Sequence, residues 1–457
     1  MSKIVIKYGG SNLKEPNGIK KLHKIISNHK KPVVVVVSAL FGITDFLETL
    51  PQNVLNKKDE IKNAVRFLSD KHFNIVQHNV NSLEYQKKIR AILDNRIKEL
   101  ENLLHGIYYI KEVPCFLKDM VLSFGERLSS LVISQVLQSN GIDCEEALPE
   151  NIGLITDGEH GNASVNITAS QSKVKKALSF EKTFVVPGFY GVSTEGKATL
   201  LGRGGTDYAA ACIANCIDSP SLEIWKDVKG FLSADPRYIK NPTRLERITY
   251  KEAAELAYFG AKILHPRTVE PLIDKSIPVN LFSTESGTIN PEPLTVINAR
   301  EEVSKNVVKS ITFSDDFCVL KLNGPGVGIK PGILARVTST LNDSCINISS
   351  VITSQISINI LLSSKDGETA RQLVDQLELP FVREIQLIND ISLVAVVGHG
   401  MIEKYGVAAK IFTVLANKSI NVLMSSMGAS EVVTYLIIDK RNRNIAVKGI
   451  HKEFFNN

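Results

Sequence analysis

The chain has 457 residues, of which 44% are hydrophobic and 22% charged, and its net charge is +6. This length predicts two or three domains, because a single hydrophobic core stops growing well below it. No apolar run approaches the roughly 20 residues of a membrane span, so we expect no membrane contact. The charge is spread along the chain without aromatic interleaving, which favours small anionic substrates over nucleic acid.

The six cysteines show neither a CxxC pair nor the spacing of a disulfide framework. Cys212 and Cys216 lie one helical turn apart in an apolar context, so we interpret them as core thiols and predict no protein metal site. A strand begins at once after the first residues and leaves no room for a signal peptide. We therefore expect a cytoplasmic protein.

The first fifty residues predict two units of strand, loop and helix. Residues 3–8 alternate in polarity and stop at Gly9-Gly10, and a helix is expected from about 16 to 28. Residues 33–37 are five valines, a run typical of a parallel strand buried on both faces. Ligands of such sheets bind beyond the carboxyl ends of the strands, which places the segment 7–11 and the loop 38–44 at a candidate site.

The middle of the chain predicts helices that cover this sheet. Residues 52–105 contain no Gly or Pro and carry apolar residues at helical spacing, so we expect two or more long helices on one side of the sheet. Further elements are a helix carrying 123–130, strands at 184–186 and 222–225, a helical segment at 251–258 and a strand at 277–282. We interpret 277–282 as the last strand of this region, and the Pro- and Glu-rich stretch from about 283 to 303 as a domain boundary.

The glycine-rich run 200–208 leads directly into an alanine-rich helix. Glycines let backbone N–H groups approach a ligand, and a helix N-terminus attracts an anion. We expect Thr206 as the N-cap and Asp207 in the first turn. Arg203 adds a forked cation suited to a carboxylate or phosphate. An ordinary turn before a buried helix would have the same pattern, so the run alone leaves the function open.

After residue 303 the chain repeats itself. Residues 332–337 match residues 406–411, which lie 74 positions later, and 346–348 match 420–422. Each copy predicts a strand, a loop, an amphipathic helix, a strand, a turn and a strand. Compact repeated modules of this kind favour a binding function over a chemical one.

Together these motifs resemble the aspartate kinases, members of the amino-acid kinase family with two appended ACT modules. The matching stretches are 7–11, 38–44, 123–130, 187–191, 201–208, 225–237 and 259–266, with the doubled module. The resemblance implies an α/β fold with a mostly parallel sheet between helices, followed by two α+β ACT modules. The implied domains are 1–290 for catalysis, 291–314 as linker and joining strand, 315–390 and 391–457. The length implies a monofunctional enzyme, without a fused homoserine dehydrogenase.

The implied reaction is ATP-dependent phosphorylation of the L-aspartate β-carboxylate, the first step toward lysine, methionine and threonine. The sequence has no P-loop and no protein-kinase signature. Phosphoryl transfer needs alignment and charge neutralisation, and the β-carboxylate is already ionised at neutral pH, so no general base is required. Mg²⁺ would be held mainly by phosphates and water. The alternatives are another amino-acid kinase, of acetylglutamate or glutamate type, and an inactive amino-acid sensor of the same fold.

The resemblance also implies residue roles. Lys7 would neutralise the transferring phosphate and Asp207 would orient Lys7. The residues that bind aspartate would be Ser38, Thr44, Glu126, Arg203 and Thr206, with Glu126 at the amino group and Arg203 at the α-carboxylate. Those that bind ATP would be Lys7, Tyr8, Gly9, Gly10, Lys226, Asp227, Leu232, Arg237, Lys262 and Ile263. The sequence departs from the family at Ser11, where Thr is usual, at Lys226, also usually Thr, and at Leu232, commonly Tyr.

The ACT modules imply feedback inhibition by an end-product amino acid and a homodimer or higher oligomer. The strand at about 306–313 is expected to complete the second module. The effector would contact Gly332, Ile333, Leu334, Asn347, Ile348, Ser349, Thr353 and Ser354. An Asp that lysine-inhibited relatives often carry is Ser349 here, so lysine and threonine both remain open, with lysine slightly preferred.

Overall fold

The computed structural model describes residues 2–261, 263–285, 291–302 and 307–455. They form two compact units. The first lies within residues 1–231, 244–257 and 262–301, and the second within 232–243, 258–261 and 302–457. Two short segments of the middle of the chain thus belong to the second unit, although their neighbours in sequence belong to the first.

The first unit is built on an eight-stranded sheet of order β3-β4-β2-β1-β7-β9-β10-β8. Its strands are β1 (Val5–Tyr8), β2 (Val34–Val37), β3 (Cys144–Glu146), β4 (Thr183–Pro187), β7 (Leu222–Lys226), β8 (Arg247–Thr249), β9 (Val279–Ser283) and β10 (Thr295–Asn298). All neighbours are parallel except β9 and β10. Tyr8 lies in register with Val37 on one side and Trp225 on the other, so the carboxyl ends of three strands meet at one edge. The predicted parallel sheet is confirmed.

One strand prediction is wrong. The stretch 277–282 does not hold the last strand of this region, because β10 follows it and pairs with both β9 and β8. β10 has only four residues with two buried, so its own sequence carries little strand signal, and pairing with its neighbours decides its conformation.

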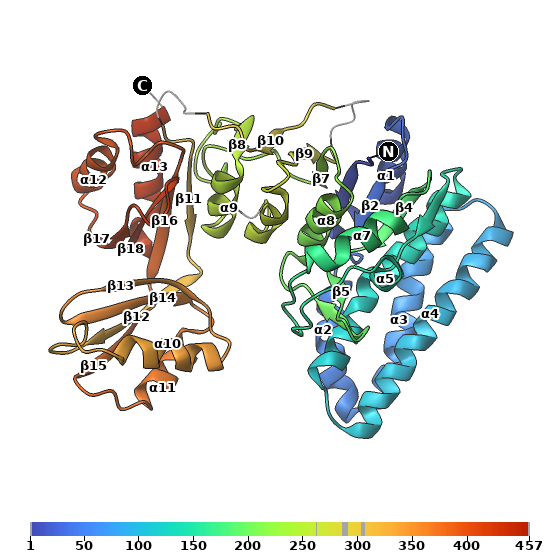
Figure 1. Cartoon of the computed structure of the whole chain (residues 1–457), viewed down its shortest axis with the longest axis horizontal. Coiled ribbons are helices and arrows are strands. Elements are labelled where there is room, and N and C mark those ends of the chain that lie inside the picture. The colour runs from blue at the N-terminus through green and yellow to red at the C-terminus, as the bar shows by residue number, and fades with distance from the viewer. Residues whose placement is uncertain (1, 262, 286–290, 303–306, 456–457) are drawn as a thin grey trace. The chain divides into compact units, whose positions relative to one another are not determined.

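Helices enclose this sheet. They are α1 (Gly18–Asn28), α2 (Ile43–Asn56), α3 (Asp59–Asn79), α4 (Leu83–Ile110), α5 (Cys115–Ser139), α6 (Pro149–Ile152), α7 (Ile167–Ala177), α8 (Gly205–Cys216) and α9 (Tyr250–Tyr258). A small hairpin, β5 (Tyr190–Val192) and β6 (Ala198–Leu200), leads into α8. The predicted long helices are α3 and α4, which lie side by side (Figure 1). Cys212 and Cys216 are buried free thiols within α8, as predicted.

One helix among the described residues, α5, is long and apolar enough to cross a membrane. However, 83% of its most apolar window is buried inside the protein, where α5 packs against α2, α3, α4 and the sheet. The central helix of a protein core is buried in the same way, so α5 is weak evidence for a membrane span.

The second unit contains two four-stranded sheets, each covered by two helices (Figure 1). The first, ordered β13-β14-β12-β15, comprises β12 (Phe317–Asn323), β13 (Ile348–Thr353), β14 (Ser357–Ser363) and β15 (Glu384–Ile388), with α10 (Ile333–Asp343) and α11 (Gly367–Asp375). The second, ordered β11-β16-β18-β17, comprises β11 (Ser310–Ser314), β16 (Ile391–Val397), β17 (Val422–Ser426) and β18 (Val433–Asp439), with α12 (Val407–Asn417) and α13 (Arg443–Phe455).

The internal repeat is confirmed in the first strand, the first helix and the edge strand of each module. β16 and α12 lie 74 positions after β12 and α10, and the edge strands β13 and β17 keep the same spacing at their first residues. Even the irregularity in edge-strand pairing recurs, after Ile348 in one module and after Val422 in the other. β11 pairs antiparallel with β16, so a strand that precedes the first module completes the second, as predicted.

Segment 232–243 packs within this second unit. Ser310 Oγ donates to the carbonyl of Leu232 at 2.7 Å, and the Ile311 N–H donates to the carbonyl of Ser233 at 2.9 Å. The Ser233 hydroxyl lies 3.0 Å from Nε2 of His451 on α13. These bonds join the segment to β11 and α13.

Candidate active site

A cavity of about 430 Å³ opens at the carboxyl ends of β1 and β2, beside the N-terminus of α8. Its walls come from segments that are far apart in sequence. The lining residues are Lys7, Gly10, Ser11, Ser38, Ala39, Leu40, Phe41, Gly42, Thr44, Asp45, Glu126, Phe189, Gly204, Gly205, Thr206, Asp207 and Lys226. The position agrees with the general rule for ligand sites in parallel α/β sheets.

Two lysines and one carboxylate form the charged centre of the cavity. Lys7 Nζ lies 2.6 Å from Oδ1 of Asp207, and Lys226 Nζ lies 2.9 Å from Oδ2 of the same residue. Lys226 Nζ also donates to the carbonyl of Ile263 at 2.7 Å. Lys7 and Asp207 are each 5% exposed, so these charges act in a medium that screens them weakly.

The protonation states follow from these contacts. Burial of Asp207 disfavours its charged form, but the ammonium groups of Lys226 and Lys7 outweigh burial and hold its pKa well below the ordinary value. Burial lowers the pKa of Lys7, and the Asp207 carboxylate opposes that effect. An anionic Asp207 shared by two lysines leaves one positive charge in excess at the floor of the cavity, which suits a phosphate.

The glycine run forms the N-terminus of α8, but not with the cap we predicted. Gly204, not Thr206, is the N-cap, and no side chain caps the helix. Gly204 has φ of 72°, and a Cβ built there would lie 2.3 Å from Cβ of His265, so both the backbone and the packing require glycine. Thr206 consequently lies within the helix, buried, while Asp207 is in the first turn as predicted.

Glu126 reaches the cavity from α5 and is only 3% exposed. Burial raises its pKa to about 8, although backbone hydrogen bonds from Ala39 and Glu126 and the charge of Lys7 favour the ionised form. Its Oε2 has no hydrogen-bond partner among the described residues. The helix is held against the loop 38–44 by Ser129, whose hydroxyl donates to the carbonyl of Ser38 at 2.7 Å. A buried carboxylate of this kind would be stabilised by a cationic ligand.

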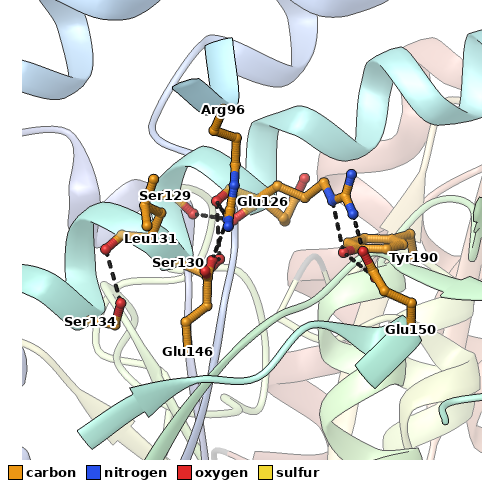
Figure 2. A network of polar contacts seen from close by, with 10 residues as sticks. Arg96, Glu126, Ser129, Ser130, Leu131, Ser134, Glu146, Glu150 and Tyr190 are labelled. Atoms are coloured by element: carbon orange, nitrogen blue, oxygen red, sulfur yellow. Dashed lines mark hydrogen bonds and ion pairs between the residues drawn. The ribbon is translucent and has the colours of Figure 1, made fainter. Parts of the chain in front are cut away.

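Behind Glu126 lies a polar network that the sequence did not predict (Figure 2). On one side, Arg96 bonds to Oε1 of Glu146 at 2.7 Å and to the carbonyl of Arg127 at 3.0 Å. On the other side, Arg127 bonds to Tyr190 and Glu150. In the sequence, the adjacent residues Glu126 and Arg127 have the pattern of a solvent-exposed ion pair. In the structure, Arg127 pairs with Glu150 instead.

The structure places the predicted substrate and nucleotide residues in different surroundings. Half of them line the cavity: Lys7, Gly10, Ser38, Thr44, Glu126, Thr206, Asp207 and Lys226. Others lie near its lining residues: Gly9 follows β1, Ile263 bonds to Lys226, and Arg203 and Asp227 are exposed next to lining residues in the sequence. Tyr8 is buried, with its hydroxyl on the carbonyl of Gly18 at 2.8 Å. Leu232 and Arg237 belong to the second unit, where Arg237 pairs with Asp235, and Lys262 lies outside the described residues.

The predicted effector residues lie on one module of the second unit. Gly332 is the N-cap of α10, followed by Ile333 and Leu334, and its φ of 90° is left-handed. Ile348, Ser349 and Thr353 belong to the edge strand β13, which Asn347 precedes and Ser354 follows. The residues of β13 are half-buried or exposed, so this strand can accept further contacts.

Comparison with known proteins agrees with this geometry. Residues 2–283 match the amino acid kinase family, and residues 394–454 match an ACT domain. Fold and family match therefore define a member of the amino acid kinase family with appended ACT modules.

The chain is 30% identical to aspartokinase 3, chloroplastic, of Arabidopsis thaliana, over 99% of this chain and 81% of that protein. It is 30% identical to the bifunctional aspartokinase/homoserine dehydrogenase of Haemophilus influenzae, over 99% of this chain and 56% of that protein. The chain thus spans about half the length of such bifunctional relatives. Its structure is similar to that of E. coli aspartokinase III in complex with lysine and aspartate, with 25% identity, a TM-score of 0.80 and 99% of each chain covered. The chain belongs to the aspartokinases within the amino acid kinase family, which confirms the resemblance seen in the sequence.

Proposed function

We propose that the chain transfers the γ-phosphoryl group of ATP to the β-carboxylate of L-aspartate, giving ADP and 4-phospho-L-aspartate. The observation that carries the proposal is the cluster of Lys7, Asp207 and Lys226 at the floor of a cavity that also contains buried Glu126. The cluster supplies positive charge where a phosphoryl group would transfer. Glu126 supplies a negative charge where the amino group of the substrate would bind.

In the transfer, a β-carboxylate oxygen forms a bond to the γ-phosphorus while the bond from that phosphorus to the bridging oxygen of ADP breaks. Charge on the transferring group and the leaving oxygen must be neutralised, and no proton has to be removed from the ionised nucleophile. Lys7, fixed by Asp207 at 2.6 Å, is oriented before substrate arrives. Such preorganised charge favours the transition state without reorganisation at the moment of reaction.

Magnesium would accompany ATP in this reaction. The ion accepts one or two carboxylates together with phosphate oxygens and water, so it needs no dedicated protein cage. The described residues contain no group of three His, Cys, Asp or Glu side chains that could hold a metal ion, and Asp207 is already bound by two lysines. Phosphate oxygens and water would therefore provide most of the ligands.

For aspartate, Glu126 would accept the amino group, and Arg203 would bind the α-carboxylate from the turn before α8. Ser38, Thr44 and Thr206 would complete the pocket. ATP would lie beside Tyr8, Gly9, Gly10, Lys226, Asp227 and Ile263, with Leu232, Arg237 and Lys262 as further predicted contacts. A structure of the E. coli relative holds lysine and aspartate, which supports aspartate as substrate and an amino acid as effector.

Regulation is part of the same proposal. We infer that an end-product amino acid binds at the N-terminus of α10 and along β13, and that the modules associate in a homodimer or higher oligomer. Allostery requires the effector to prefer one global state, so its binding and aspartate binding should affect each other reciprocally. Whether lysine or threonine is the effector would be decided by titrating each against activity. A cytoplasmic location is also proposed, from the free cysteines alone.

The decisive test is release of ADP with aspartate, glutamate or acetylglutamate as acceptor. We expect turnover with aspartate at least tenfold above that with either alternative, and hydroxylamine should trap the acyl phosphate product. Preference for acetylglutamate or glutamate would identify another amino-acid kinase. A chain that binds aspartate without releasing ADP would instead be an inactive sensor.

A further inference from the structure

Glu126 and Arg127 are neighbours on α5, but their side chains have different surroundings. Glu126 lines the cavity, whereas Arg127 interacts with β5 and α6. Nε of Arg127 donates to the hydroxyl of Tyr190 at 3.2 Å, and its terminal nitrogen pairs with Glu150. The Tyr190 hydroxyl donates in turn to Oε2 of Glu150 at 3.0 Å, which closes a three-membered cluster (Figure 2).

Tyr190 joins this cluster to the opposite wall of the cavity. It is fully buried and pairs with Leu200 in the hairpin of β5 and β6, which leads directly into the glycine run. The preceding residue, Phe189, lines the cavity, and its carbonyl accepts the N–H of Leu201 at 2.8 Å. Phe189 also lies against Gly205, where an added Cβ would be 3.0 Å from its ring.

The main chain at Arg127 is held as well as its side chain. Its carbonyl accepts from Arg96 at 3.0 Å, and Arg96 and the Ser130 hydroxyl both donate to Oε1 of Glu146, at 2.7 and 2.6 Å. Each arginine therefore has its own carboxylate partner. The Glu126 carboxylate is left facing the cavity, with one oxygen that has no hydrogen-bond partner among the described residues.

We propose that Arg127, Tyr190 and Glu150 are positioning residues that set the distance between Glu126 and the glycine run, and thereby the affinity for the amino-acid substrate. The inference rests on the proposed function, because it assigns the substrate's amino group to Glu126. A tyrosine hydroxyl can accept from Arg127 and donate to Glu150 at once, whereas phenylalanine can do neither. Arg127, Tyr190 and Glu150 are not among the residues that line the cavity, so we expect the cluster to act on substrate binding and not on the transfer step.

The test compares Tyr190→Phe with a matched control, Tyr250→Phe. Tyr250 is also buried, and its hydroxyl donates one hydrogen bond, to the carbonyl of Ile277 at 2.7 Å, but it belongs to a different part of the fold from Arg127 and Glu150. We expect Tyr190→Phe to raise KM for aspartate about tenfold, with kcat and KM for ATP changed less than about twofold. Glu150→Gln, at a more exposed position, should have the same signature. Tyr250→Phe should lower the melting temperature by a similar amount and leave all three kinetic constants unchanged.

Two outcomes would overturn the inference. KM for aspartate could stay at the wild-type value in both Tyr190→Phe and Glu150→Gln, or all three kinetic constants could change in equal proportion, as general loosening would cause. Failure of the proposed function has a different signature, because the wild-type chain would then release no ADP in response to aspartate. In that case both the proposed function and the inference are wrong. If the wild type is active and the variants are unaffected, only the inference is wrong.

Discussion

Lowering the pH through 8 should weaken the binding of aspartate, because the carboxyl of Glu126 then becomes protonated. Burial raises the pKa of Glu126 to about 8 in the protein without ligand. Below that pH the group is mainly neutral and offers no charge to the substrate's ammonium; above it the carboxylate is ready to bind. About one tenth of the molecules carry the ionised group at pH 7, and about nine tenths at pH 9.

The size of the effect follows from these fractions. If only the ionised form binds aspartate, kcat/KM for aspartate should rise about tenfold between pH 6 and 7 and level off above pH 8. Binding at pH 7 should also release about 0.9 proton per site, because the ligand's charge favours ionisation. At saturating aspartate, kcat should not fall as the pH is lowered, because the bound ammonium group keeps Glu126 ionised.

The assay is the initial rate of ADP release at limiting aspartate and saturating ATP from pH 6 to 9, at constant ionic strength. Calorimetry in two buffers of different ionisation enthalpy measures the released proton. Glu126→Gln is the matched control, with a low kcat/KM that should not change across this range. A flat wild-type profile from pH 6 to 8 would refute a neutral Glu126 in this range, and the same rise in Glu126→Gln would show that another group controls aspartate binding.

Three further predictions follow from the cavity. Lys7→Ala should lower kcat by about a thousandfold and change KM for aspartate only a few-fold, because its charge acts in the transition state; near-normal turnover would refute that role. Asp207→Asn should cost about 3 kcal/mol in urea unfolding, since two lysines lose their shared buried partner, and an unchanged midpoint would contradict the ion-pair geometry. Gly204→Ala should lower the free energy of unfolding by about 2–3 kcal/mol, because of backbone strain and collision with His265. Gly42 has φ of 79° with open space around it, so Gly42→Ala should lower it by only about 1 kcal/mol. Equal losses in the two variants would mean that packing at Gly204 is unimportant.

Much of the first unit could be predicted because its signals are local. The five valines of 33–37 predict a strand buried on both faces, and β2 is fully buried. The alternation of residues 3–8 also predicts a strand, although β1 is buried on both faces and not on one. The glycine run likewise predicts a helix N-terminus. The cap itself was predicted wrongly, because the choice between Gly204 and Thr206 depends on His265, which is 61 positions away in the sequence and lies against Gly204 in the structure.

The features that could not be predicted depend on contacts between distant segments. Lys226 has no local pattern that distinguishes it from a solvated lysine; only the placement of β7 beside β1 brings it to Asp207. Arg127 has the same difficulty, since its partners Tyr190 and Glu150 come from separate elements. In the sequence alone, a carboxylate or an arginine of such a network cannot be distinguished from one on the surface. Burial, which gives each its energetic weight, is a property of the folded chain.

The internal repeat also shows a limit of sequence-based prediction, because regular spacing along the chain does not determine which strands pair. A spacing of 74 positions predicts two equal modules. β18 and α13 lie 76 positions after β14 and α11, while the first strand, the first helix and the start of the edge strand of each module obey the spacing of 74. The fourth strand of each sheet does not: β15 follows the other elements of its module, whereas β11 precedes the entire first module and pairs with β16 of the second. Cutting the chain between the modules would therefore leave β16 with an unpaired edge. Because β11 also bonds to segment 232–243, the strand that completes the second module is the one that holds part of the predicted nucleotide region.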